Sequence, residues 1–212
     1  MSLPKKLPDG FVYVSEICSS IQVDLMYNTD DNFTGSIVPG YKKNVAVMTE
    51  KAALQLAKVQ DHLSTIGFGL KIKDSYRPQD AILAFKKWSQ EPEDFKMKEK
   101  YYPNLEKSKL FELGYISEKS AHNRGSTVDL TLVRLQDNSE LDMGTIVDFL
   151  DDLSHTENQT ISEEAKKNRE LLKQSMEFYG FKNYYKEWWH YQLNDEPIPA
   201  TSITEPFNFY VE

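Results

Sequence analysis

The chain has 212 residues, of which 40% are hydrophobic and 27% are charged, a balance typical of a folded globular protein. This length allows one sizeable hydrophobic core, and we expect residues 1–212 to form a single domain. The net charge of -8 argues against a nucleic-acid partner, because affinity for nucleic acid depends on Lys and Arg side chains that neutralise phosphates.

No segment of the chain predicts a membrane protein. Residues 1–10 contain no apolar stretch long enough for the core of a signal peptide, and no run of about 20 apolar residues occurs anywhere. We therefore expect a cytoplasmic protein without a membrane partner.

The first half of the chain predicts two strands, a long loop and two helices. Residues 11–17 are rich in β-forming residues and predict a strand, and the irregular residues 28–40 predict an ordered loop over a site. From Thr49 to Gly67 apolar residues recur at helical spacing, which predicts an amphipathic helix. Residues 70–73 alternate as a short strand that runs into Asp74, and a second helix is expected to begin near Pro78.

The second half contains fewer clear periods. Residues 91–119 show none, and we expect them to be mostly loop. Residues 128–133 alternate as a strand, Ser162 is expected to open a helix that ends at Gly180, and residues 184–193 predict a closing strand. Because helices and strands do not alternate regularly, the predicted fold class is α+β, with an antiparallel-rich sheet flanked by helices.

Histidine and cysteine usage limits the possible chemistry. Cys18 is the only cysteine, so no intrachain disulfide or thiolate cluster can form, and a bound metal would need His and carboxylate ligands. The chain has four histidines, of which we interpret His62 as a surface or boundary residue and His155 as solvated or structural. The two that remain, His122 and His190, are candidate ligands.

His122 lies in the segment S-A-H-N-R-G-S-T-V-D-L-T-L, seven residues before Asp129. In a straight strand this spacing would direct the two side chains to opposite faces, but a turn near Gly125 would let them converge. Two histidines and one carboxylate form an open zinc set that leaves a position for water, although the same set also holds iron(II) in oxygenases. The spacing by itself is more typical of a structural histidine than of a metal ligand.

Two further segments carry candidate catalytic groups. In Y-Y-K-E-W-W-H-Y, Glu187 precedes His190 by three residues, so that a general base would neighbour a ligand. In D-S-Y-R-P, Arg77 stands at a strand-to-helix junction and carries a permanent charge suited to a developing oxyanion. Taken alone, each segment also has a structural reading, since the Trp pair is typical of a core and Arg77–Pro78 of a helix start.

Taken together, D-S-Y-R-P, S-A-H-N-R-G-S-T-V-D-L-T-L, M-G-T-I-V-D-F and E-W-W-H-Y resemble, in this order and at these separations, the D-alanyl-D-alanine dipeptidases of the VanX type. The resemblance spans nearly the whole chain and implies the zinc-peptidase fold shared with D,D-carboxypeptidases and the Hedgehog signalling domain. It implies one zinc ion per chain, held by His122, Asp129 and His190. It also implies Glu187 as the base that later acts as an acid, and Arg77 as the partner of the oxyanion.

The same resemblance implies a substrate site. Asp148 and the backbone near Tyr27 would receive the substrate ammonium, and Ser120 would lie close to the bound dipeptide. One departure is Thr127, which stands where the broader metal motif usually has Ala; its hydroxyl would be tolerated if it faced a polar neighbour.

The implied reaction is hydrolysis of D-alanyl-D-alanine to two D-alanines. One alternative is a D,D-carboxypeptidase or L,D-endopeptidase that acts on longer peptidoglycan stem peptides, and another is a zinc-binding domain without activity. The presence of both Glu187 and Arg77 argues against the latter, because binding alone requires neither. The oligomeric state and the physiological task, whether vancomycin resistance, cell-wall recycling or dipeptide nutrition, stay open at this stage.

Overall fold

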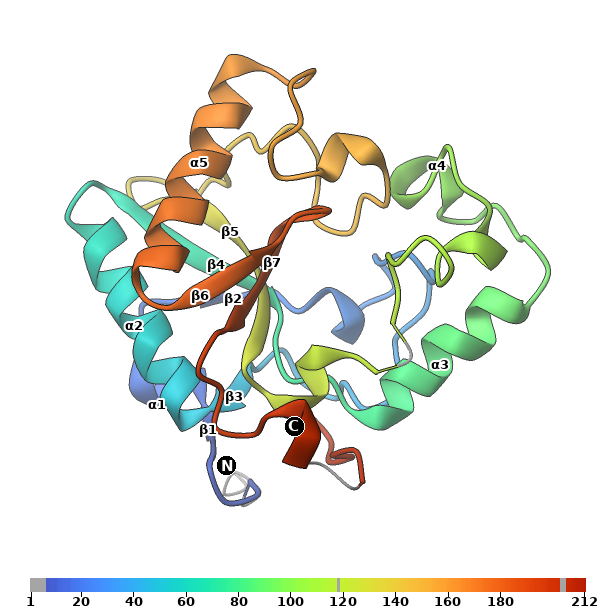
Figure 1. Cartoon of the computed structure of the whole chain (residues 1–212), viewed down its shortest axis with the longest axis horizontal. Helices are drawn as coiled ribbons and strands as arrows, with labels where there is room; N and C mark the ends of the chain where they lie inside the picture. Colours follow the sequence, from blue (N-terminus) through green and yellow to red (C-terminus); the bar gives the residue numbers. More distant parts are fainter. Residues whose placement is uncertain (1–6, 118, 203–204) are drawn as a thin grey trace.

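The computed structural model describes residues 7–117, 119–202 and 205–212; residues 1–6, part of the segment searched for a signal peptide, lie outside it (Figure 1). Its centre is a five-stranded sheet. In spatial order the strands are β2 (Gln22–Val23), β4 (Phe68–Asp74), β5 (Thr127–Arg134), β7 (Glu187–Leu193) and β6 (Phe181–Tyr184). Only β2 and β4 are parallel, and the other three pairs are antiparallel. The predicted α+β class with an antiparallel-rich sheet is confirmed.

The long helices lie on two sides of this sheet (Figure 1). On one side, α2 (Glu50–Ser64) contacts β4, and α5 (Glu163–Phe178) contacts β5, β6 and β7. α3 (Gln79–Gln90) lies on the other side. These three helices confirm the periodicities seen in the sequence, and α5 begins as predicted, with the Ser162 hydroxyl accepting a hydrogen bond from the Ala165 amide at 3.1 Å.

Short elements complete the chain. They are β1 (Phe11–Tyr13), α1 (Val14–Ile17), β3 (Val47–Thr49), α4 (Lys98–Tyr101) and the 3-10 turns η1 (Met26–Asn28), η2 (Lys107–Lys109), η3 (Ala121–Arg124), η4 (Asp152–Ser154) and η5 (Ala200–Ser202). β1 and β3 form a separate two-stranded antiparallel sheet. Within the described residues, no helix combines the length and the apolar character needed to cross a lipid bilayer.

Two of the predicted strands are wrong in their bounds. The strand expected at residues 11–17 ends at Tyr13, because its partner β3 offers only three residues for pairing, and the chain then turns into α1. The closing strand expected at residues 184–193 is instead the second half of a hairpin, whose turn at Tyr185 separates β6 from β7. β-forming residues are favourable in a strand only where a partner strand lies beside them, and the sequence does not show where that partner ends.

Candidate active site

Three predicted ligands converge from three separate elements. His122 lies in η3, Asp129 in β5 and His190 in β7, and one potential ligand atom from each lies within 4.8 Å of the other two. His122 Nε2 is 3.3 Å from His190 Nδ1 and 3.3 Å from Asp129 Oδ2, and His190 Nδ1 is 3.0 Å from Asp129 Oδ1. The side chains could therefore bind one ion together.

Strand register explains the position of two of these residues. Asp129 of β5 lies directly opposite His190 of β7 and, on its other side, opposite Asp74 of β4. The register of β4 shifts by one residue between Ile72 and Asp74, as in a β-bulge, so Asp74 rather than Lys73 lies beside Asp129. A row of polar residues thus crosses three neighbouring strands.

A turn brings His122 to this row, as the sequence predicted. Gly125 ends η3 with a φ of +73°, in the left-handed region, and a Cβ at this position would lie 2.4 Å from Phe11 Cε1. Only glycine therefore fits the turn. His122 Nδ1 lies 2.7 Å from the carbonyl oxygen of Ser75, which can only accept, so Nδ1 carries the proton and the lone pair of Nε2 is left for a ligand.

An irregular pairing brings Glu187 next to His190. Residues three apart in a regular strand point to opposite faces, yet Glu187 Oε2 lies 3.6 Å from His190 Nδ1. The register shifts here, because Asn183 pairs with Tyr191 and the next residue, Tyr184, pairs with Glu187. The Asn183 side-chain amide donates to the carbonyl oxygens of Glu187 and His190, each at 3.0 Å, and so stabilises the irregular backbone.

Burial and neighbouring charges perturb the site's acids and bases. Burial raises the pKa of Glu187 well above its usual range, and the charges of Asp129 and Asp148 raise it further, so this carboxyl binds a proton readily. Burial opposes the charged form of Asp129, but the adjacent His122 and His190 outweigh it and hold the pKa of Asp129 far below its usual range. Burial also lowers the pKa of His190, which favours the neutral imidazole that a metal ligand requires.

Arg77 is held against the same row of residues. Its Nε and Nη2 donate to Asp74 Oδ2 at 2.9 Å and 2.8 Å, and Nη2 lies 3.6 Å from Asp129 Oδ2. Burial opposes its charge, but Tyr27, Asp74 and Tyr41 keep the pKa of Arg77 well above its usual range. Sequence reasoning missed Asp74 as a site residue, although a carboxylate three residues before the arginine in D-S-Y-R-P was a visible signal.

The predicted site residues line one cavity of about 710 Å³. Its lining includes Tyr27, Arg77, Ser120, His122, Asp129, Asp148, Glu187 and His190. Asp148 belongs to an irregular segment, residues 143–155, termed here the Asp148 loop. The Tyr27 hydroxyl donates to Asp148 Oδ2 at 2.6 Å, so the side chain of Tyr27, and not only its backbone, belongs to the site. Burial, followed by the charge of Asp129, raises the pKa of Asp148 to about 7.

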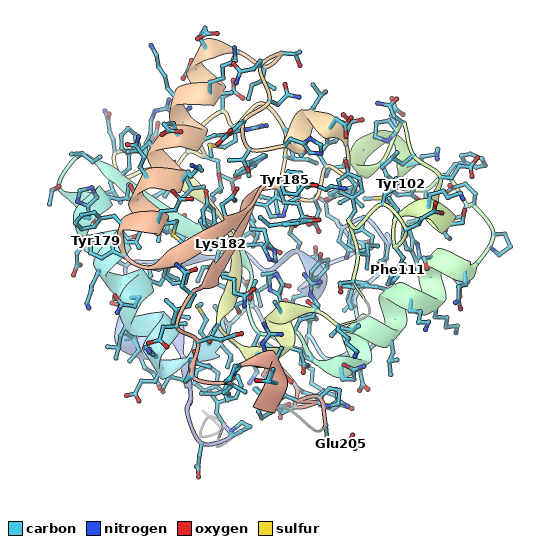
Figure 2. The ribbon with its side chains drawn as sticks, viewed as in Figure 1. Tyr102, Phe111, Tyr179, Lys182, Tyr185 and Glu205 are labelled. Carbon is cyan, nitrogen blue, oxygen red and sulfur yellow. The ribbon has the colours of Figure 1, made fainter. Side chains whose placement is uncertain are left out.

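Other parts of the cavity wall were not identified from the sequence. Phe33, from the long loop expected over a site, lines the cavity and packs edge-on against Tyr27 with ring centroids 5.9 Å apart. The segment after α4 contributes Phe111 and Tyr115, and Figure 2 shows Phe111 in this segment and Tyr185 at the turn of the β6–β7 hairpin. The segment after α4 carries no periodicity, so no local signal in the sequence could have placed it there.

Comparison with known proteins identifies the family of the chain. The family model described as D-ala-D-ala dipeptidase matches residues 8–208. The chain belongs to this family of peptidases. A D-alanyl-D-alanine dipeptidase of Enterococcus faecalis is 42% identical over 97% of this chain and 100% of its own length. Those of Enterococcus faecium and Streptomyces coelicolor are 43% and 41% identical, over 93% and 92% of this chain and 98% and 97% of their own lengths.

Thr127 was expected to be tolerated if its hydroxyl faced a polar neighbour, but among the described residues the hydroxyl forms no hydrogen bond. The residue is fully buried at the start of β5, and within the described part of the chain its Oγ1 has no hydrogen-bond partner. Thr127 shares the face of the strand with Asp129, two residues on. The peptidase thus buries an unpaired hydroxyl beside a candidate ligand.

The C-terminal segment connects the turn that carries Arg77 with the turn that carries His122. No signal in the sequence indicated this connection. Asn123 Nδ2 donates to the carbonyl oxygens of Arg77, at 2.9 Å, and of Phe207, at 2.6 Å, while its Oδ1 accepts from the Phe207 amide at 2.9 Å. The ring of Phe209 stacks on that of Tyr76 with centroids 3.9 Å apart. The turns that carry the arginine and the first histidine are therefore joined through a segment more than 80 residues away in the sequence.

Proposed function

We propose that the protein is a zinc-dependent dipeptidase that hydrolyses D-alanyl-D-alanine to two molecules of D-alanine. The observation that carries this proposal is the convergence of His122, Asp129 and His190 in a cavity that Glu187 and Arg77 also line. The curated relatives named above are D-alanyl-D-alanine dipeptidases, and their similarity covers nearly the whole chain, which supports the same substrate here.

The chemistry of the donor set fits zinc. Imidazole nitrogens and a carboxylate oxygen are ligands that Zn²⁺ takes, and three protein ligands leave a position open, as in catalytic sites. The hydrogen bond from His122 Nδ1 to the Ser75 carbonyl is the kind of contact that orients a ligating imidazole. When bound, zinc would act as a Lewis acid and lower the pKa of water to about 7.

Glu187 is placed to move the protons of the reaction. Its carboxylate would accept the proton of the attacking water and then deliver it to the departing amine nitrogen. Its Oε2 lies 3.6 Å from the nearest nitrogen of His190, close enough to serve the same reaction centre. The raised pKa of Glu187 suits the second step, because a carboxyl that retains its proton is an effective acid near neutral pH.

Arg77 is placed to stabilise the oxyanion. Asp74 fixes its Nε and Nη2, and within the described residues its Nη1 donates to no protein acceptor. The guanidinium is therefore preorganised and keeps one donor group for the substrate. A fixed donor of this kind stabilises the charge that develops in the transition state without having to reorganise.

Asp148 is placed to recognise the substrate amine. The residue lines the cavity and is only 6% exposed, so an incoming ammonium would pair with its carboxylate in a largely desolvated setting. An acylated N-terminus carries no charge for this pairing, which favours a free dipeptide over the longer stem peptides cleaved by D,D-carboxypeptidases or L,D-endopeptidases. The strength of such a pair is greater than that of an exposed ion pair, because water screens it less.

The test combines metal analysis with three substrates. Metal-free protein, reloaded with zinc, should bind one zinc ion per chain and release D-alanine from D-alanyl-D-alanine, but much more slowly from its N-acetyl derivative and from a tripeptide ending in the same two residues. Equal cleavage of all three would assign the protein to the carboxypeptidase alternative. Zinc binding without any cleavage would favour the non-catalytic alternative.

A further inference from the structure

Arg169 of α5 is a buried cation whose role the reaction does not explain. The residue is 1% exposed, and burial lowers its pKa to about 10, so it stays protonated at neutral pH. Its hydrogen bonds within the described residues go to three carbonyl oxygens and one hydroxyl, and none goes to a carboxylate. Burying a charge is unfavourable, and the charge of Asp142 only partly offsets the effect of burial on the pKa of Arg169, so these contacts require an explanation.

The four polar contacts of Arg169 described above all lie on the Asp148 loop. Nε donates to the carbonyl oxygen of Met143 at 2.7 Å, and Nη1 donates to that of His155 at 2.7 Å. Nη2 donates to the carbonyl oxygen of Leu153 at 3.0 Å and lies 3.5 Å from Thr145 Oγ1. The guanidinium therefore joins the first residues of the loop to its last ones. Figure 1 shows the chain between β5 and α5 passing beside the upper end of α5.

The middle of the same loop holds a strained residue. Asp148 has a φ of +62°, in the left-handed region, a conformation that persists in a non-glycine residue only where the surroundings hold it. Tyr27 contacts its carboxylate, and the Leu150 amide donates to the carbonyl oxygen of Tyr101 at 2.7 Å. Contacts thus hold the middle of the loop, while the hydrogen bonds from Arg169 to Met143, Leu153 and His155, termed here the Arg169 clamp, hold its ends.

The Arg169 clamp also reaches the strand that carries the candidate base. Trp188 directly follows Glu187 in β7, its Nε1 donates to Thr145 Oγ1 at 2.8 Å, and its ring lies 5.8 Å from the guanidinium carbon of Arg169. The Asp148 loop and β7 therefore share one set of contacts around the guanidinium. A shift at this point would change the distance between the amine site and the reaction centre.

We propose that Arg169 is a positioning residue for substrate selectivity. By closing both ends of the Asp148 loop, it holds the Asp148 carboxylate at the distance from Glu187 that a dipeptide with a free N-terminus requires. The inference rests on the proposed function, and it adds to that function a residue that lines no part of the cavity.

The first test compares two substitutions in the same helix. Arg169→Met keeps much of the bulk of the side chain and removes the donors, whereas Leu172→Ala opens a gap in the hydrophobic core beneath α5. Arg169→Met should lower kcat/KM for D-alanyl-D-alanine by on the order of 10²-fold, because small displacements of a positioning group have effects of this size. It should leave the slow cleavage of the N-acetyl dipeptide nearly unchanged, so that the preference for the free amine falls. Leu172→Ala should lower thermal stability and keep the preference.

A double-mutant cycle shows whether Arg169 acts through Asp148. In an Asp148→Asn background, Arg169→Met should cause little additional loss, whereas fully additive losses would overturn the proposal. Arg169→Lys keeps the charge but reaches fewer of the carbonyl oxygens, and it should restore part of the preference. This variant also provides the measurement if Arg169→Met does not fold.

Hydrogen exchange of the zinc-loaded and metal-free proteins separates this inference from the proposed function. The amides of the Asp148 loop should exchange faster in Arg169→Met than in Leu172→Ala, because only the former releases the ends of the loop. If wild-type protein fails to cleave D-alanyl-D-alanine, the proposed function is wrong, while faster exchange confined to the loop would still support the positioning role. Unchanged exchange in the loop would overturn the inference whatever the activity.

Discussion

The floor of the cavity and the wall that carries Asp148 are built in different ways. On the floor, Asp129 and His190 occupy opposite positions in paired strands, so backbone hydrogen bonds set their separation. On the wall, Asp148 lies in a loop whose only regular element is the turn η4, and the side chain of Arg169 holds its ends. The candidate metal ligands therefore depend on the sheet as a whole, whereas the amine site depends on a few side chains.

The largest effect is expected on the floor, from Glu187→Gln. The amide has the shape of the carboxyl but cannot exchange the proton, so kcat should fall by about 10²–10⁴-fold, the usual contribution of a general acid or base. Zinc content should stay at the wild-type value, because Glu187 is not one of the three proposed ligands. Thermal stability should not fall, since burial already disfavours the ionised form. Near-normal turnover with full zinc content would remove Glu187 from the mechanism.

A somewhat smaller effect is expected where the floor meets the wall, at Arg77. Arg77→Ala should lower kcat by about 10²–10³-fold, because the guanidinium stabilises charge that develops only in the transition state. Arg77→Lys is the matched control, since it keeps the charge and loses the fork of donors that engages Asp74. Steady-state kinetics decide the role, because an increase in KM alone would assign Arg77 to ground-state binding.

On the wall, the raised pKa of Asp148 predicts a pH-dependent stability. The folded metal-free protein retains this proton up to a pKa of about 7, whereas the unfolded chain loses it near the ordinary value of 3.8. The group therefore lowers the free energy of unfolding progressively as pH rises between these two values, and adds no further slope above them. Asp148→Asn removes this titration and tolerates the left-handed backbone.

Chemical denaturation at several pH values measures this effect in the metal-free proteins. Asp148→Asn should gain stability relative to wild type as pH rises from about 4 to about 8, by at most about 4 kcal/mol. Parallel stability curves for the two proteins would show that the Asp148 carboxyl is already ionised in the folded state. In that case the wall would carry an ionised carboxylate before substrate binds, as the floor does at Asp129.

The smallest effect is expected at Thr127, whose buried hydroxyl has no hydrogen-bond partner among residues 7–117, 119–202 and 205–212. Thr127→Val has nearly the same shape and should raise the free energy of unfolding by about 1 kcal/mol, because it removes an unpaired polar group. Thr156→Val is the matched control, since the Thr156 hydroxyl donates to Asn183 Oδ1 at 2.6 Å, and it should lower stability. A loss of stability in both variants would mean that the Thr127 hydroxyl has a partner, such as a bound water.

The positions of the long helices and of one turn could be predicted from the sequence. The helices α2, α3 and α5 follow from apolar residues at helical spacing, and the start of α5 follows from Ser162, because both signals act between residues a few positions apart. The motifs around His122, Glu187 and Arg77 predicted these residues as candidate site residues, and Gly125 predicted the turn after His122. The cytoplasmic location and the single domain stay predictions.

The contacts between the elements of the site could not be predicted from the sequence. The register shift that sets Asp74 beside Asp129 depends on the pairing of β4 with β5, and the contact between Glu187 and His190 depends on the irregular pairing of β6 with β7. The Arg169 clamp is likewise invisible in the sequence, because a buried arginine in a polar helix has the same local pattern as an exposed one. The pairing of β4 with β5 joins segments far apart in the chain, and even in the short β6–β7 hairpin the register follows from which backbone groups pair. Local propensity carries no information about either choice.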